Sequence, residues 1–458
     1  MSESSKLSNA LTKGGPGDKF LGDGKVDTTE WFKNVDVIEN QIKNEEIWFC
    51  GAPFQMLYTS TRGELMPCSW AAEGFGPNVQ DTKIVDYFVN NKTLNNMRHE
   101  MTTPGSTLET CKIMCKSCMH QEKEYGRSRR QASLKIQTND RGLWPRMRNA
   151  VQTFKKTSKA RITEQIFEIQ IKAFGNKCNL DCYMCIPYDS STRLTTIARD
   201  ELKEENIFSE FAKTPLESIK DTKLDSVIDQ ITEIAPYIYN LKFIGGEPLV
   251  MKQFYTLLEK IVATGYAKQM RVKYQTNMSV LGLEKTQLTK FIPEFEMFEF
   301  TVSLDGIGEA NNYIRRRSNW EDIINNIKTV LKYPNVTINV NGTISFLSVL
   351  RFYELINWFD ENSQEFDQIN WSNIRGPAKL CANVLPDEIK QDLIVKYSNF
   401  PDIVNVLKES NHNYDYQETL DYLLMIDNRY KDTKWDMDLF EVYPELEKFH
   451  KPKMIRKS

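Results

Sequence analysis

The sequence predicts an α/β fold: a partial (β/α)6 TIM-like barrel with an N-terminal cysteine-rich domain and a C-terminal helical extension. From about residue 166 onward, segments of strand character alternate with amphipathic helical segments at short spacing. This alternation requires crossover connections, and therefore a parallel sheet with helices packed against it. About six strand–helix units are present, which is fewer than the eight of a closed barrel.

The barrel elements can be placed in order from their residue patterns. The first strand, QIFEIQIKAF, directly precedes a cysteine-rich loop, and the segment FYTLLEKIVATGY reads as an amphipathic helix that ends at a glycine. The region from LPDEIKQDLIVKY to the end of the chain is predicted to be helical. The predicted strands are 165–174, 239–248, 270–277, 298–306, 336–345 and 366–374, and the predicted helices include 254–266, 320–333 and 349–363.

Composition and pattern divide the chain into five regions. The first 20 residues are polar and rich in Ser, Gly and Lys, which predicts disorder, and the segment 45–120 carries turn signals with little helical periodicity. The predicted regions are an N-terminal extension (1–45), a cysteine-rich domain (46–130), a basic linker (131–165), the partial barrel (166–385) and a C-terminal helical extension (386–458).

The overall charge and hydropathy exclude several classes of protein. The net charge is −3, which indicates neither a nucleic-acid partner nor an anionic membrane for the molecule as a whole. The sequence has no membrane-spanning apolar run and no secretory signal, so we expect a cytoplasmic protein. One basic stretch, 127–161, fits a solvated connecting helix, or else a docking surface for an acidic substrate or nucleic acid.

Nine cysteines in a reducing compartment are expected to be thiols, ligands or nucleophiles rather than disulfides. Three of them, Cys178, Cys182 and Cys185, lie in the stretch CNLDCYMC directly after the first barrel strand. Soft thiolates at this spacing suit zinc or an iron–sulfur cluster. A structural zinc site would need a fourth ligand, and none of the four histidines is near the loop in sequence. Three thiolates on a four-iron cluster would leave one iron open.

The CxxxCxxC motif after the first barrel strand resembles that of the radical S-adenosylmethionine (SAM) superfamily. The resemblance implies that Cys178, Cys182 and Cys185 are the catalytic ligands of a [4Fe–4S] cluster whose open iron chelates SAM. It further implies that reductive cleavage of SAM yields a 5′-deoxyadenosyl radical, which abstracts hydrogen from a substrate. Relatives usually place an aromatic residue before the third cysteine, where it meets the adenine. This chain has Met184 there, with Tyr183 one residue earlier.

The ends of the later strands carry further motifs of the same resemblance. Gly245, Gly246, Glu247 and Pro248 form the sequence GGEP at the end of the second strand. Glycines let a ligand approach the backbone closely, and the resemblance implies that this motif grips the amino group of SAM. Asn277, with Thr276 before it, ends the third strand, and Asn341 lies near the end of the fifth; both positions fit either pocket lining or strand capping.

The fourth strand ends in SLDG, where Ser303 and Asp305 could bond ribose hydroxyls. Arg315 follows in the stretch NNYIRRRSNW, and its guanidinium could clamp the carboxylate of SAM in a bidentate manner. Arg316 and Arg317 are alternatives for the same role.

The N-terminal cysteines form a second set. Cys50, Gly63 and Cys68 fit the pattern C-x12-G-x4-C, and Cys111, Cys115 and Cys118 follow. The pattern resembles the opening of the SPASM/twitch auxiliary-cluster domain, although that domain normally follows the barrel. Five cysteines here imply at most one auxiliary [4Fe–4S] cluster. Its implied ligands are Cys50, Cys68, Cys115 and Cys118, with Cys111 as the alternate.

A zinc ion remains an alternative for this second set, because four thiolates would close around it equally well. The cysteine that stands alone, Cys381, is predicted to be a buried core thiol.

The resemblances together predict an oxidoreductase-type radical SAM enzyme that acts on a peptide or protein side chain. The alternative reaction is oxidation or rearrangement of a small molecule such as a sugar or nucleotide. An alternative of another class is a non-catalytic iron–sulfur or zinc-binding sensor or scaffold. The enzyme hypotheses imply an electron donor such as flavodoxin or ferredoxin, and no membrane partner.

Overall fold

The structure is a computed structural model. It describes residue 41 and residues 46–126, 128–139, 143–161, 168–199, 221–374, 376–410 and 414–451. The predicted N-terminal extension lies outside these residues apart from residue 41, as do parts of the basic linker and of the segment that follows the cysteine loop.

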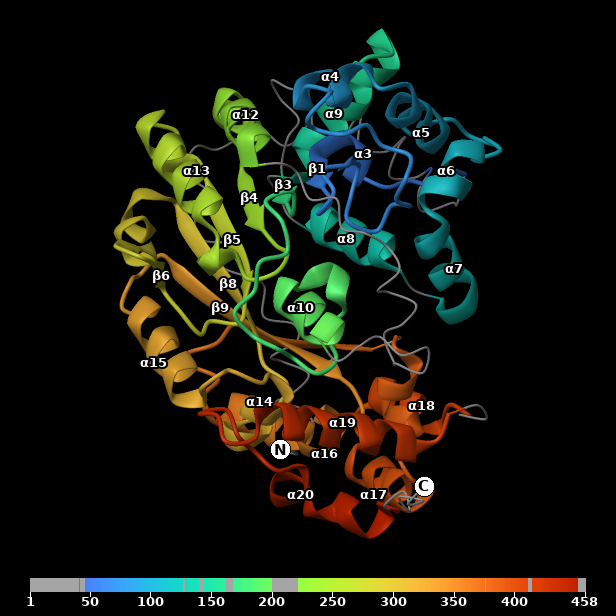
Figure 1. Cartoon of the computed structure of the whole chain (residues 1–458). Helices are drawn as coiled ribbons and strands as arrows, with labels where there is room; N and C mark the ends of the chain where they lie inside the picture. Colours follow the sequence, from blue (N-terminus) through green and yellow to red (C-terminus); the bar gives the residue numbers. More distant parts are fainter. Residues whose placement is uncertain are drawn as a thin grey trace.

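Within the described residues, one eight-stranded sheet runs through the molecule in the order β10-β9-β8-β5-β4-β3-β1-β2 (Figure 1). All six predicted barrel strands are present, and neighbouring strands pair in parallel, which confirms the predicted partial barrel. These strands are β3 (Glu168–Ile171), β4 (Asn240–Phe243), β5 (Arg271–Thr276), β8 (Met297–Ser303), β9 (Val336–Ile344) and β10 (Gln368–Asn373). A separate hairpin contains β6 (Gly282–Leu283) and β7 (Thr286–Gln287).

The two faces of the sheet differ in polarity because side chains alternate along each strand. On β8, Phe300 and Val302 are buried in the main hydrophobic core, while Thr301 is partly exposed on the opposite face. The polar face continues across the neighbouring strands, because Thr301 pairs with Asn339 of β9, and Asn339 pairs with Gln368 of β10. The apolar face packs against the surrounding helices, and the polar face forms the inside of the partial barrel.

Helices connect the strands as predicted. In α15, the Asn319 side chain accepts a hydrogen bond from the Asp322 backbone N–H, which is a typical N-cap. The helices of the barrel region are α10 (Ser191–Arg199), α12 (Asp221–Glu233), α13 (Lys252–Ala263), α14 (Gly308–Ile314), α15 (Trp320–Val330) and α16 (Ser348–Glu361). The C-terminal region is helical, as predicted, with α17 (Asp387–Lys396), α18 (Pro401–Lys408), α19 (Tyr416–Tyr430) and α20 (Leu439–Val442).

The N-terminal segment contains more helix than the sequence predicts. Three of these helices, α3, α4 and α6, have seven residues or fewer, so they offer few turns to show an apolar periodicity. Most of the helices pack around a small hydrophobic core of their own. They are α3 (Ala52–Gln55), α4 (Ile84–Asn90), α5 (Lys92–Thr102), α6 (Glu109–Met114), α7 (Lys116–Tyr125), α8 (Arg129–Asn139) and α9 (Leu143–Thr157). The last two occupy much of the basic stretch, where Arg130 pairs with Glu122 at 2.7 Å and Arg129 lies over Trp70.

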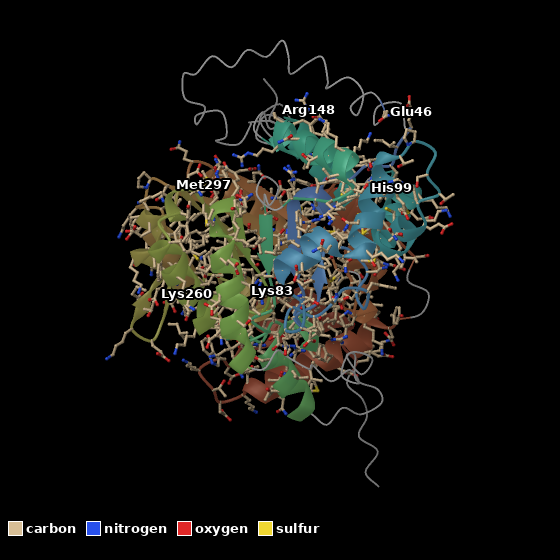
Figure 2. The ribbon with its side chains drawn as sticks, turned by 90° about the horizontal axis from the view of Figure 1, so that it is seen from above. Glu46, Lys83, His99, Arg148, Lys260 and Met297 are labelled. Carbon is tan, nitrogen blue, oxygen red and sulfur yellow. The ribbon has the colours of Figure 1, made fainter. Side chains whose placement is uncertain are left out.

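Two strands that the sequence analysis missed join the N-terminal segment to the barrel. β1 (Met56–Thr59) pairs in parallel with β3, and β2 (Leu65–Met66) pairs antiparallel with β1. Figure 2 shows Lys260 of α13 and His99 of α5 on opposite sides of the molecule, so the N-terminal segment lies beside the barrel at its β3 edge. The domain boundaries given above stay predictions. No described helix is long and apolar enough to cross a membrane.

Candidate active site

A cavity of about 260 Å³ lies where the barrel strands end. Most of the residues singled out in the sequence line it, although they come from segments well over a hundred residues apart. The predicted residues that line it are Cys178, Cys182, Cys185, Gly245, Gly246, Glu247, Asn277, Ser303 and Arg315. The parallel sheet explains this convergence, because it places the carboxyl ends of all its strands at one edge.

The three thiols of the cysteine loop share one buried neighbourhood. Burial and, to a smaller extent, the nearby Cys182 raise the pKa of Cys178 to about 12. Burial and the other two cysteines likewise place the pKa of Cys185 well above its usual range. Thiolates are therefore disfavoured here unless a positive charge binds them, and metal ions supply such a charge.

The loop is fixed by backbone contacts as well. The Thr192 hydroxyl donates to the Cys178 carbonyl at 2.6 Å, and the Cys185 N–H donates to the Cys182 carbonyl at 3.1 Å. Among the described residues, no three His, Cys, Asp or Glu side chains form a ready site for a single metal ion. Sulfurs around one tetrahedral zinc lie only about 3.8 Å apart, whereas a four-iron cluster holds its cysteine sulfurs farther apart.

The glycine pair after β4 packs directly on the chain that leads into the cysteine loop. Gly245 and Gly246 have φ values of +92° and +47°, which favour glycine. A Cβ on Gly246 would lie 2.2 Å from the Lys177 carbonyl oxygen, and the Glu247 N–H donates to the same oxygen at 2.8 Å. The GGEP turn and the cysteine loop are therefore held together as one unit.

Glu247 ties this unit to the end of β5. Its buried carboxylate accepts hydrogen bonds from the Asn277 N–H at 2.6 Å, the Thr276 hydroxyl at 2.8 Å and the Leu249 N–H at 2.9 Å. Burial raises the pKa of Glu247 to about 7, although these hydrogen bonds act in the opposite direction.

The structure distinguishes among the three consecutive arginines. The Arg315 guanidinium forms an ion pair with Asp305 at 2.7 Å, and its Nη1 lies 4.0 Å from the Cys182 sulfur. Arg316 instead pairs with Asp427 at 2.5 Å, and Arg317 donates to the Tyr430 hydroxyl at 2.9 Å. Arg315 is thus the arginine that lines the cavity.

Four of the predicted cofactor-binding residues are not among the residues that line the cavity. Asp305 is fully buried, where it holds Arg315 and accepts from the Thr343 N–H at 2.7 Å. Met184 and Tyr183 are buried in the hydrophobic core, with the Tyr183 hydroxyl bonded to Ser345. The remaining two are Pro248 and Asn341.

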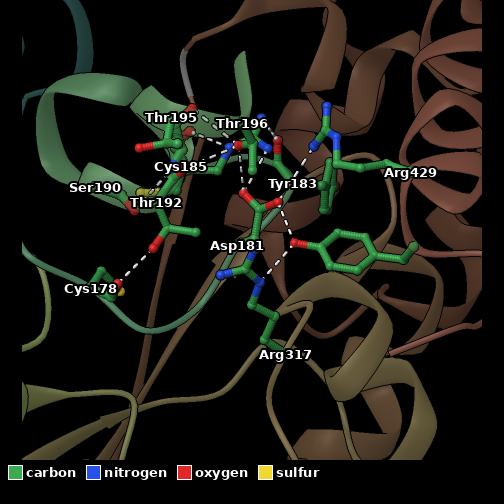
Figure 3. Close-up of polar contacts among 12 residues, drawn as sticks. Cys178, Asp181, Tyr183, Cys185, Ser190, Thr192, Thr195, Thr196, Arg317 and Arg429 are labelled. Atoms are coloured by element: carbon green, nitrogen blue, oxygen red, sulfur yellow. Dashed lines mark hydrogen bonds and ion pairs between the residues drawn. The ribbon is translucent and has the colours of Figure 1, made fainter. Parts of the chain in front are cut away.

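Sequence reasoning missed several cavity residues and one buried network. Lys172 and Asp189, which line the cavity, form an ion pair at 2.5 Å. Behind the cysteine loop, Asp181 is bound by groups from α10 and α19 (Figure 3). The only sequence signal for this network was the charged residue Asp181 within the cysteine loop. Its partners on α19 are more than 200 residues away along the chain.

The four cysteines assigned to the second centre also lie together. Burial raises the pKa of Cys68 to about 11, with smaller contributions from Cys115 and Cys118. Cys50 is buried next to Cys68 and Cys115, which raises its pKa as well. Cys111 also lies against this group, because its side chain contacts Cys115 and raises the pKa of that thiol, while its own thiol lies 3.9 Å from the Met97 carbonyl oxygen.

Comparisons with known proteins match part of the chain to a family. The sequence pattern of the Radical SAM superfamily matches residues 173–345. No curated protein sequence matches the chain. A structure of anSMEcpe with bound AdoMet is 17% identical, with a TM-score of 0.35 and coverage of 57% of this chain and 66% of that one.

Two structures of SuiB from Streptococcus suis are also similar. The one bound to the precursor peptide SuiA is 16% identical, with a TM-score of 0.33 and coverage of 72% of this chain and 64% of that one. The one bound to S-adenosylmethionine is 14% identical, with a TM-score of 0.34 and coverage of 80% and 72%. This chain thus spans slightly less than two thirds of the first two structures. Residues 173–345, which include the three-cysteine loop, are thus the part of the chain that matches the Radical SAM superfamily.

Proposed function

We propose that this protein is an enzyme that reductively cleaves SAM at a [4Fe–4S] cluster held by Cys178, Cys182 and Cys185. The observation that carries the proposal is the single cavity lined by these three thiols, the GGE turn and Arg315. When bound there, the cluster and SAM would supply a 5′-deoxyadenosyl radical that abstracts hydrogen from the substrate.

The residues present fit these groups. The buried thiols need a positively charged partner to ionise. Gly245 and Gly246 line the cavity, and a Cβ on either would clash with the segment that leads into the cysteine loop. The buried Nε of Arg315 has no hydrogen-bond partner among the described residues, so it remains available to a carboxylate such as that of SAM.

The surrounding side chains fix these groups in place. Asp305 orients the Arg315 guanidinium toward the cavity through their ion pair. Glu247 locks the GGEP turn to the ends of β4 and β5. Preorganised groups of this kind bind a ligand without losing side-chain freedom on binding.

The class of substrate we propose is a peptide or protein side chain. Two rows of residues across β8, β9 and β10 give the inner face uncharged hydrogen-bonding groups, which both donate and accept as a peptide backbone does. The same face also holds the Lys273–Glu299 ion pair at 2.8 Å. β10 is the outermost strand on its side, so an extended chain could approach along that edge. The two rows of paired residues are Thr301, Asn339 and Gln368, and Ser303, Asn341 and Asn370.

The charges in the cavity disfavour a phosphorylated small molecule. Lys172 and Arg315 are the cations among its lining residues, and each is already paired with a carboxylate. A phosphate on the substrate would have to compete with Asp189 for Lys172 and with the SAM carboxylate for Arg315.

We also propose one auxiliary [4Fe–4S] cluster on Cys50, Cys68, Cys115 and Cys118. The mutual influence of the four thiols supports this set, and Cys111, whose side chain contacts Cys115, is the alternate ligand. A fully ligated cluster of this kind would pass electrons, and an external donor such as flavodoxin or ferredoxin would supply the reducing electron.

The decisive experiment measures 5′-deoxyadenosine formed from SAM by the anaerobically purified, reduced protein. The wild-type chain should form it, and Cys182→Ala should form none, while Cys381→Ala serves as a cysteine control outside the cavity. Purified protein that contains zinc but neither iron nor sulfide would contradict the enzyme proposal. For the substrate class, peptides with deuterated side chains should transfer deuterium to 5′-deoxyadenosine, whereas deuterated nucleotide sugars should not.

A further inference from the structure

A buried ionic network lies directly behind the cysteine loop (Figure 3). Its centre is Asp181, the residue before Cys182, whose side chain is fully buried. One carboxylate oxygen accepts from Arg193 of α10 at 2.9 Å. The other accepts from the Tyr430 hydroxyl at 2.7 Å and lies 3.4 Å from Arg429 Nη1, both on α19.

The same side chains also hold the backbone of the cysteine loop. Arg193 donates to the Cys185 carbonyl at 3.3 Å, and the Tyr422 hydroxyl of α19 donates to the Tyr183 carbonyl at 2.9 Å. The Asp181 N–H donates to the Arg316 carbonyl at 2.9 Å. The loop is therefore clamped between α10 and α19, and α19 lies outside the segment that matches the superfamily.

The network places two guanidinium groups and one carboxylate close together in the protein interior. Burying such a group of charges is costly, and it stabilises a fold no better than well-packed apolar residues would. Fixed charges next to an iron–sulfur cluster do, however, shift its reduction potential, and contacts behind the ligands set the geometry of a metal site.

We propose that Asp181, Arg193 and Arg429 are positioning residues that hold the cysteine loop and tune the reduction potential of the cluster bound to it. The C-terminal helix α19 is then a part of the cluster site. This inference rests on the proposed function, because it requires a cluster on Cys178, Cys182 and Cys185.

The test uses two variants that remove opposite charges from the network. Asp181→Asn removes the negative charge, so it should raise the midpoint potential of the cluster. Arg429→Gln removes a positive charge, so it should lower that potential. Both variants should lower the unfolding midpoint, so a purely structural role would not separate them. The potential is measured by redox titration of the electron paramagnetic resonance (EPR) signal that changes on addition of SAM, because only a cluster with an open iron responds.

Two further variants serve as controls. Arg429→Lys keeps the charge, so it should leave the potential near the wild-type value. Glu445→Gln breaks the Arg351–Glu445 pair at 2.6 Å, which also joins the C-terminal region to the barrel but is not part of the network; it should lower stability alone. If Asp181→Asn fails to hold a cluster, the comparison of Arg429→Gln with Arg429→Lys tests the tuning role. Only Arg429→Gln should then have a lowered midpoint potential.

Unchanged potentials, or shifts of the same sign in Asp181→Asn and Arg429→Gln, would overturn the tuning role. A wild-type protein without any SAM-responsive signal would instead refute the proposed function, and this inference with it.

Discussion

Arg315 and Asp305 form an ion pair of 2.7 Å inside the core, and the same guanidinium lies 4.0 Å from the sulfur of Cys182. Asp305 follows β8, while Arg315 follows the short helix α14. The pair therefore fixes one cation between the end of a barrel strand and the cysteine loop. Its two neighbours in sequence, Arg316 and Arg317, point toward α19.

Replacement of Arg315 should weaken SAM binding. Arg315→Gln removes a charged hydrogen-bond donor from the cavity, so the Kd for SAM should rise about 10- to 100-fold. Arg317→Gln is the matched control, because its guanidinium contacts Tyr430 outside the cavity, and it should bind SAM as the wild type does. The Kd can be measured by titration of the cluster's EPR signal. Equal affinities in the two variants would remove Arg315 from the SAM site.

The close packing of the GGEP turn gives a second prediction. Gly246 has a positive φ of +47°, and a Cβ added there would lie 2.2 Å from the Lys177 backbone oxygen. Gly246→Ala should therefore lower the free energy of unfolding by about 2–5 kcal/mol and weaken SAM binding.

Gly308→Ala is the control for this glycine. Its φ of +52° is similar, but nothing lies within 4 Å of the added Cβ. It should lose only about 1–2 kcal/mol from backbone strain. Chemical unfolding of both variants measures the difference, and similar losses would show that the contact with the Lys177 carbonyl is relieved at little cost.

The sequence predicted those parts of the site that are encoded in short local patterns. Cys178, Cys182 and Cys185 lie on one loop, and the residues after β4 and β8 follow recognisable strands, so the parallel sheet alone brings them together. The choice of Arg315 among three arginines needed the structure, because the partners of Arg316 and Arg317 lie on α19.

Features that depend on distant packing were not predictable in this way. Asp181 is separated from Tyr430 by 249 positions, and nothing near either residue marks their contact. β1 joins the sheet through its pairing with β3, which no local pattern reveals. Asn341 was placed near the cavity from its position in the strand, but the cavity lies on the side of β8 that faces β5 and β4, where Gln275 and Ile244 line it.

The auxiliary cysteines give the last prediction. Cys68→Ala should remove one cluster, so that iron and sulfide per chain fall together while the SAM-responsive EPR signal of the barrel cluster persists. The reason is that Cys68 lies close to both Cys115 and Cys118. Cys111 contacts Cys115 and the Met97 carbonyl instead, and Cys381 contacts the Ile374 carbonyl. Cys111→Ala and Cys381→Ala should thus keep the wild-type iron content and show only the modest loss of stability of a small cavity. Elemental analysis could instead find zinc in the wild type and show that Cys68→Ala loses this zinc without any change in iron. That result would show that the second centre is a structural zinc site and not an auxiliary cluster.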